Sequence, residues 1–102
     1  MSNSLVELQK EYTDLSLRMS DAQIFSSPDY IHISKRHTEI GHKIELLEGI
    51  ENLKSQILES EDLLKDPELK EMAEEELTQL KAKLETQQSI WIDLITPKEN
   101  FA

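Results

Sequence analysis

The tetrapeptide Lys65-Asp66-Pro67-Glu68 lies between two long amphipathic stretches and predicts where the chain reverses. Aspartate is a favoured helix N-cap and proline fits the first position of a helix, so Asp66 and Pro67 predict the start of a new helix. Glu68 and Glu71 would then face the positive end of that helix dipole. Because a short connection makes two long helices antiparallel neighbours, the stretch predicts a helical hairpin.

Two sets of mostly apolar side chains after the reversal recur every seven residues. One set is Leu77, Leu84 and Trp91, and the other is Ala73, Leu80, Gln87 and Leu94. The two sets form the a and d positions of a coiled-coil seam over three heptads. We expect Trp91 in this seam, although a partly open hairpin would leave its ring available to a partner.

The stretch before the reversal predicts one long helix. Ser27-Pro28-Asp29 gives its start signal, and it can run from about Pro28 to about Leu64, roughly 55 Å at 1.5 Å per residue. Its predicted seam contains Ile33, Ile40, Ile44, Leu47, Ile50, Leu53, Ile57 and Leu64. Gly41 and Gly49 interrupt the interior, so we expect a mild bend or a close helix contact near them.

A shorter helix precedes these two. Its apolar stripe follows alternating steps of three and four through Leu5, Leu8, Tyr12, Leu15 and Met19. Ser4 with Glu7 forms a capping box at its start. The predicted fold is all-α, with one domain over residues 1–102. It has three helices and is dominated by a long antiparallel, coiled-coil-like hairpin on which the short N-terminal helix packs.

Composition bounds the function. The 102 residues carry a formal net charge of −10, which disfavours nucleic acid and favours basic protein surfaces as partners. The first residues do not read as a signal peptide, and no apolar run approaches the roughly 20 residues that span a bilayer. We therefore expect a soluble, cytoplasmic chain without a membrane partner. It contains no cysteine, which excludes disulfides.

Candidate chemistry is sparse. The histidines at positions 32, 37 and 42 are five residues apart, which scatters them over different helix faces, so we expect surface histidines on a polar face. Glu39-x-x-His42 has the spacing of half a di-iron site, but the other helices offer no second such pair, so a helical metalloenzyme fragment is kept only as a contrast. The glutamates at 74–76 predict a solvated acidic face. We expect no enzyme activity, cofactor or metal.

One stretch carries a family resemblance. Residues 63–77 read Leu63-Leu64-Lys65-Asp66-Pro67-Glu68-Leu69-Lys70-Glu71-Met72-Ala73-Glu74-Glu75-Glu76-Leu77. This order resembles the signature LL-x-DPE-(L/M)-x-E-(M/L)-A-x-EE-L in the N-terminal domain of bacterial peptide chain release factor 1. The closing Leu94-Ile95-Thr96-Pro97-Lys98 is similar to that family's exit, and we expect the turn-like, polar residues 96–100 to lead into a missing segment.

The resemblance implies a class I termination factor, which binds the ribosomal A site, reads UAA and UAG, and triggers hydrolysis of peptidyl-tRNA. That family's Gly-Gly-Gln motif and codon-reading tripeptide are absent from these 102 residues, so neither activity is expected here. The family's first domain lies toward the stalk base of the large subunit, where the GTPase that recycles the factor is thought to approach. The sister factor that reads UGA is the second family interpretation.

The exposed reversal is the predicted partner-binding site. Its residues are Lys65, Asp66, Pro67, Glu68 and Glu71, although the family supplies no motif that fixes the contact. The expected partners are stalk-base proteins of the large ribosomal subunit and, with them, the recycling GTPase. Pairing of two hairpins through an exposed part of the seam is a further expectation. The alternative is a free-standing coiled-coil adaptor or chaperone-like hairpin, for which the seam alone would suffice.

Overall fold

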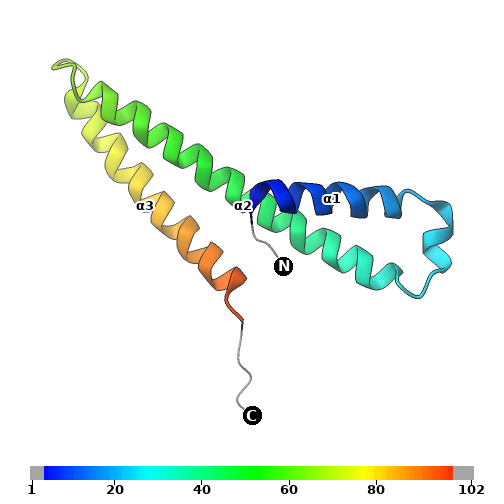
Figure 1. Ribbon diagram of the computed structural model, residues 1–102. Helices are drawn as coiled ribbons and strands as arrows, with labels where there is room; N and C mark the ends of the chain where they lie inside the picture. The colour runs from blue at the N-terminus through cyan, green and yellow to red at the C-terminus, as the bar shows by residue number, and fades with distance from the viewer. Residues whose placement is uncertain (1–3, 98–102) are drawn as a thin grey trace, which may run out of the picture. The chain divides into compact units, whose positions relative to one another are not determined.

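The computed structural model describes residues 4–97, and within them the chain forms three α-helices, one 3-10 helix and no strand (Figure 1). The helices are α1 (Leu5–Met19), η1 (Ala22–Ser26), α2 (Tyr30–Leu63) and α3 (Lys70–Ile95). The all-α prediction with three α-helices is confirmed. Most of the expected exit at residues 96–100 lies outside the described residues.

The chain divides into two compact units, and the boundary between Glu45 and Leu46 falls within α2. The first unit contains α1, η1 and the start of α2, and the second contains the remainder of α2 and α3. The expectation of one domain over residues 1–102 stays a prediction. No helix among the described residues is long and apolar enough to cross a membrane.

The predicted start signals are present, although two of them act one turn before the regular helix. Ser4 caps α1 as expected, because its Oγ accepts the backbone N–H of Glu7 at 3.3 Å. Ser27 Oγ accepts the backbone N–H of Asp29 at 3.2 Å, and α2 begins at Tyr30. The chain thus enters α2 through a capped turn.

The prediction that Asp66 caps the third helix and Pro67 begins it is wrong. Asp66 Oδ1 accepts the backbone N–H of Glu68 at 2.9 Å, but α3 begins at Lys70 with Leu69 at its N-cap. The N–H of Leu69 bonds to the Asp66 carbonyl three residues back, at 3.1 Å, which is the pattern of a tight turn. The same residues therefore cap a turn that leads into the helix.

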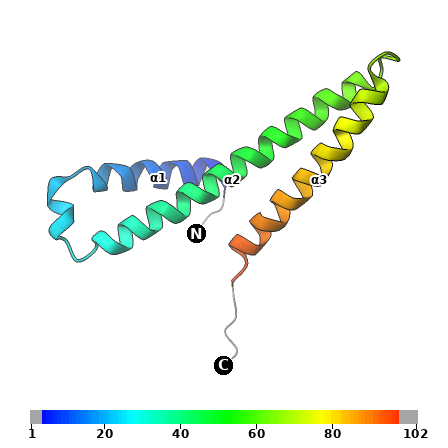
Figure 2. The same cartoon turned by 180° about the vertical axis from the view of Figure 1, so that it is seen from behind.

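The first unit is held by an apolar contact between α1 and the start of α2, which run side by side in both views (Figures 1 and 2). Leu8 and Leu15 of α1 are buried, as are Ile33 and Ile40 of α2. Leu8 and Ile40 are the largest side chains that lose essentially all contact with solvent. The alternating apolar stripe of the first helix is therefore its packing face.

The second unit is an antiparallel hairpin of the end of α2 and α3. Its core cluster consists of buried Ile57, Leu77 and Leu80, with partly buried Leu53, Leu64 and Leu84 packed against it. Ile50, Ser60 and Ala73 are also buried. These residues are a and d positions of both helices, so the hairpin prediction is confirmed.

Burial along α3 decreases with distance from the reversal. Ala73, Leu77 and Leu80 are buried, Trp91 is partly buried, and Leu94 is 46% exposed. The seam positions of α3 after Leu80 are thus only partly buried or exposed. The seam predicted over three heptads is therefore closed only in its first part.

The two glycines of α2 have different surroundings, and this difference gives a matched test. A Cβ placed on Gly41 would lie 3.4 Å from Cε2 of Tyr12, whereas one placed on Gly49 would meet nothing within 4 Å. We expect Gly41→Leu to lower the free energy of unfolding by about 1–3 kcal/mol, because a long side chain must displace the Tyr12 ring.

Gly49→Leu should leave the stability unchanged or raise it by up to about 1 kcal/mol, because leucine is the better helix former and the position is open. Urea unfolding of the two variants, followed by circular dichroism, compares the same substitution in the same helix. Equal destabilisation by both substitutions would contradict the different surroundings of the two glycines.

Candidate functional site

The predicted partner-binding residues lie together at the reversal between α2 and α3. Lys65, Asp66, Pro67, Glu68 and Glu71 are all exposed. Lys65 Nζ donates to Asp62 Oδ1 at 3.1 Å, and Asp66 Oδ1 accepts the backbone N–H of Glu68 within the turn. The turn is thus ordered by its own side chains, while the side chains of Glu68 and Glu71 face solvent. Their role in binding stays a prediction.

Charge is concentrated around this reversal. Residues 59–76 contain nine acidic residues and two lysines, which is a net charge of −7 in a chain whose total is −10. All of these charged residues are exposed in the structure. The arrangement creates a local negative field that attracts basic surfaces and fades over about 10 Å at 0.1 M salt.

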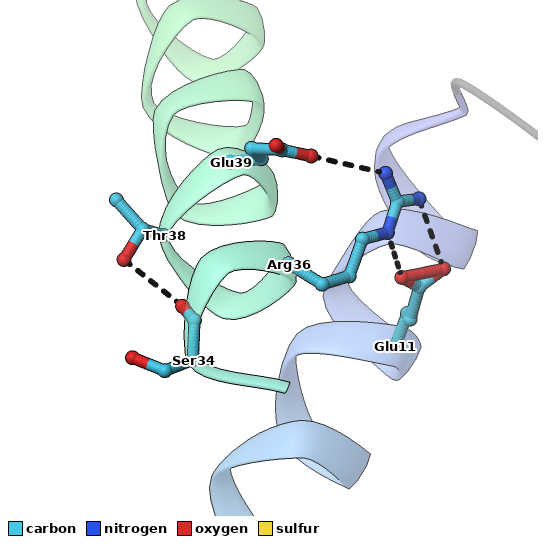
Figure 3. Close-up of polar contacts among 5 residues, drawn as sticks. All are labelled: Glu11, Ser34, Arg36, Thr38 and Glu39. Atoms are coloured by element: carbon cyan, nitrogen blue, oxygen red, sulfur yellow. Dashed lines mark hydrogen bonds and ion pairs between the residues drawn. The ribbon is translucent and has the colours of Figure 1, made fainter. Parts of the chain in front are cut away.

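A second polar cluster joins α1 to α2, and no pattern in the sequence predicts it. Arg36 of α2 donates from Nε to Glu11 Oε2 at 2.6 Å and from Nη2 to Glu11 Oε1 at 3.2 Å (Figure 3). Glu39 approaches the same guanidinium at 3.8 Å. The Arg36 and Glu11 side chains are 21% and 37% exposed, so this two-pronged pair is only partly shielded from solvent.

The pair shifts the protonation equilibria of both groups. The hydrogen bond from Arg36 lowers the pKa of Glu11 below its ordinary value of 4.5, against the opposing effect of desolvation. The same hydrogen bond raises the pKa of Arg36. Both shifts favour the charged forms, so the pair stabilises the contact between α1 and α2 at neutral pH.

His37 lies beside this pair and is not the surface histidine that the sequence predicted. Its ring is partly buried and stacks on Tyr12, with centroids 4.2 Å apart and planes inclined by 19°. Its Nε2 also forms a hydrogen bond of 2.9 Å with Ser16 Oγ. The prediction that the three histidines lie on different helix faces is correct, but the face that carries His37 contacts α1.

The other candidate chemistry is not assembled. His42 is exposed, and Glu39 is 60% exposed and oriented toward Arg36. Within residues 4–97, no three His, Cys, Asp or Glu side chains lie close enough to hold a metal ion together. The glutamates at positions 74–76 are exposed on α3, as the solvated-face interpretation requires. The polar groups of this part of the chain thus form surface and helix contacts.

The lowered pKa of Glu11 predicts a stability contribution with a defined pH dependence. A carboxylate whose folded-state pKa is lowered stabilises the fold above its unfolded-state pKa, and the effect is lost as pH falls through the folded-state value. We expect Glu11→Gln to lower the free energy of unfolding at pH 7 by up to about 1 kcal/mol, since the pair is partly solvent-screened.

Urea unfolding between about pH 2 and pH 7 should therefore show a shallower acid dependence for Glu11→Gln than for the original chain. Asp14→Asn removes an exposed carboxylate of the same helix and serves as the matched control. An acid dependence of Glu11→Gln identical to that of the original chain would contradict this assignment.

Comparison with known proteins shows the family. The PCRF domain matches residues 8–102. The chain is 35% identical over 86 residues to peptide chain release factor 1 of Thermus thermophilus and 33% identical over 86 residues to that of Deinococcus deserti. Each alignment covers 83% of this chain and 24% of the relative. No solved structure gives a significant match.

A third relative extends the alignment. Peptide chain release factor 1 of Geobacter metallireducens is 30% identical over 100 residues, which cover 97% of this chain and 28% of that protein. The chain therefore spans about a quarter of the length of these curated relatives. Because the family match includes nearly all of α1 and the whole of η1, α2 and α3, this chain belongs to the PCRF domain family.

Proposed function

We propose that this chain is the helical, partner-binding part of a bacterial translation termination factor that acts at UAA and UAG. The observation that carries the proposal is the family match over residues 8–102, together with relatives that are all named peptide chain release factor 1. The agreement of the Asp66-Pro67-Glu68 stretch with that family's signature supports it. Cytoplasmic localisation follows as part of the same proposal.

In this proposal the chain contributes no catalytic group. Its only two glycines, Gly41 and Gly49, are eight residues apart, so no Gly-Gly-Gln motif is present in these 102 residues. The ionisable pair with shifted pKa values, Glu11 and Arg36, is engaged in holding two helices together. Codon reading and hydrolysis of peptidyl-tRNA would then reside in other parts of the factor.

The proposed contribution is docking, through the acidic reversal. Proteins of the large-subunit stalk base are the proposed partners, together with the GTPase that recycles class I factors. Exposed carboxylates such as Glu68 and Glu71 suit a basic protein surface. Complementary charge of this kind increases the rate of encounter more than it deepens affinity. Association of the chain with itself is a separate proposal that involves the other end of α3.

A domain replacement tests the proposal. In the release factor 1 of Thermus thermophilus, the aligned segment is exchanged for the corresponding segment of this chain, and release of a peptide from ribosomes is measured at UAA, UAG and UGA. We expect release at UAA and UAG within roughly threefold of the parent factor, because docking changes mainly the rate of encounter with the ribosome. We expect no release at UGA and no release by this chain alone.

The same replacement carrying Glu68→Gln and Glu71→Gln should bind ribosomes about two- to threefold more slowly at low salt, and the difference should disappear as salt screens the charges. Asp14→Asn with Glu45→Gln removes the same charge from exposed positions of the first unit and is the matched control. A folded replacement that binds ribosomes no better than a factor lacking the segment would overturn the proposal and favour the adaptor alternative.

A further inference from the structure

The second unit contains a groove beside Gly49, and the packing of the hairpin does not account for a glycine at this position. The hollow is about 480 Å³ in volume and lies between α2 and α3, lined by Gly49, Leu53, Ala82, Lys83, Thr86 and Gln87. Apart from its neighbours in the chain and the backbone of its own helix, no atom of residues 4–97 lies within 4 Å of where a Cβ of Gly49 would be. A glycine inside a helix costs up to about 1 kcal/mol against alanine, and no internal contact offsets that cost here.

One stripe of α3 continues from this groove. Lys83, Thr86, Ile90 and Asp93 are separated by steps of three, four and three, so they lie along one face of the helix. All four are exposed, and Ile90 is 48% exposed. Neither Lys83 nor Asp93 forms a salt bridge within residues 4–97. The stripe thus presents a cation at one end, an anion at the other and an apolar side chain between them.

The spacing of this stripe is symmetric about position 88. Lys83 and Asp93 are five residues on either side of that position, and Thr86 and Ile90 are two residues on either side. An antiparallel copy of the same helix, related by a two-fold axis near residue 88, would place Lys83 opposite Asp93 of the second copy. It would also place Ile90 opposite Thr86, at the edge of the groove over Gly49.

The local charge permits such a pairing. Residues 81–97 contain two lysines, one glutamate and one aspartate, so this part of α3 is neutral although the chain as a whole carries −10. Two copies meeting here avoid bringing their acidic reversals together, and they gain two symmetry-related pairs of opposite charge. A second copy necessarily carries the complementary charge at the matching distance along its own helix, which favours a second copy as the occupant.

We propose that the Lys83–Asp93 face of α3 binds a second copy of this chain in an antiparallel, two-fold arrangement, with Ile90 of each copy entering the groove over Gly49 of the other. The contact spans about 15 Å of helix, which is small for a protein interface and predicts weak, concentration-dependent association. The inference is independent of the proposed termination role, because it rests on residues 49–93 of this chain alone.

Sedimentation velocity of the full chain tests this proposal over a concentration series from about 10 µM to about 1 mM, a range suited to a small interface. The expected result is a sedimentation coefficient that rises with concentration. Ile90→Ser should abolish the rise, while Ile92→Ser, which changes a more exposed side chain of the same helix, should not. A chain that stays monomeric throughout would overturn the proposal, as would an equal loss in both variants.

A charge exchange tests the two-fold geometry itself. Lys83→Glu alone and Asp93→Lys alone should each weaken association by at least about threefold, because each places like charges opposite one another. The double variant should restore association, since the exchanged charges again meet their opposites in the second copy. Lys81→Glu makes the same charge change off the stripe and should have a smaller effect than Lys83→Glu.

Circular dichroism of each variant verifies that the helices are intact. Failure of the double variant to restore association would overturn the antiparallel arrangement. Loss of association in Leu94→Ser but not in Ile90→Ser would also overturn it, since the open end of the seam would then be the contact.

Discussion

The structure depends on the burial of two successive stretches of α2, the first against α1 and the second against α3. Ile33 and Ile40 pack in the unit that contains α1, and Ile50 and Ile57 are buried in the unit that contains α3. Each contact buries only a narrow apolar stripe, since 31% of the residues are charged and 37% are hydrophobic. α2 therefore belongs to both units, and packing against α1 stabilises its first part while packing against α3 stabilises its second part.

The sequence predicts the helices and the hairpin well, because periodicity and start signals are local properties. It misplaces the start of α3, since Asp66 is equally able to cap a helix or a tight turn and only the backbone decides between them. The Glu11–Arg36 pair and the Tyr12–His37 stack were beyond prediction, because they depend on the register of α1 against α2. Periodicity fixes which face packs, but not which residue lies opposite which.

The surface of the second unit divides by charge. Acidic residues gather at the reversal, and the last turns of α3 are neutral and carry exposed apolar side chains. The reversal was predicted as a site because its residues are turn and cap formers that face solvent. The groove at Gly49 was not predicted, because the sequence does not show whether a neighbouring side chain occupies the space beside a helical glycine. Tyr12 occupies that space at Gly41, and no side chain in the described part of the chain does so at Gly49.

Hydrogen exchange along α2 tests most directly whether this helix is stabilised by two separate contacts. Leu8→Ala removes a buried side chain from the first unit, and Leu77→Ala removes one from the second. If the two contacts are separate, Leu8→Ala lowers amide protection around Ile33 and Ile40 and leaves it intact around Ile57, while Leu77→Ala does the reverse. Equal loss of protection along the whole of α2 in both variants would show a single cooperative structure and contradict the separation of the two contacts.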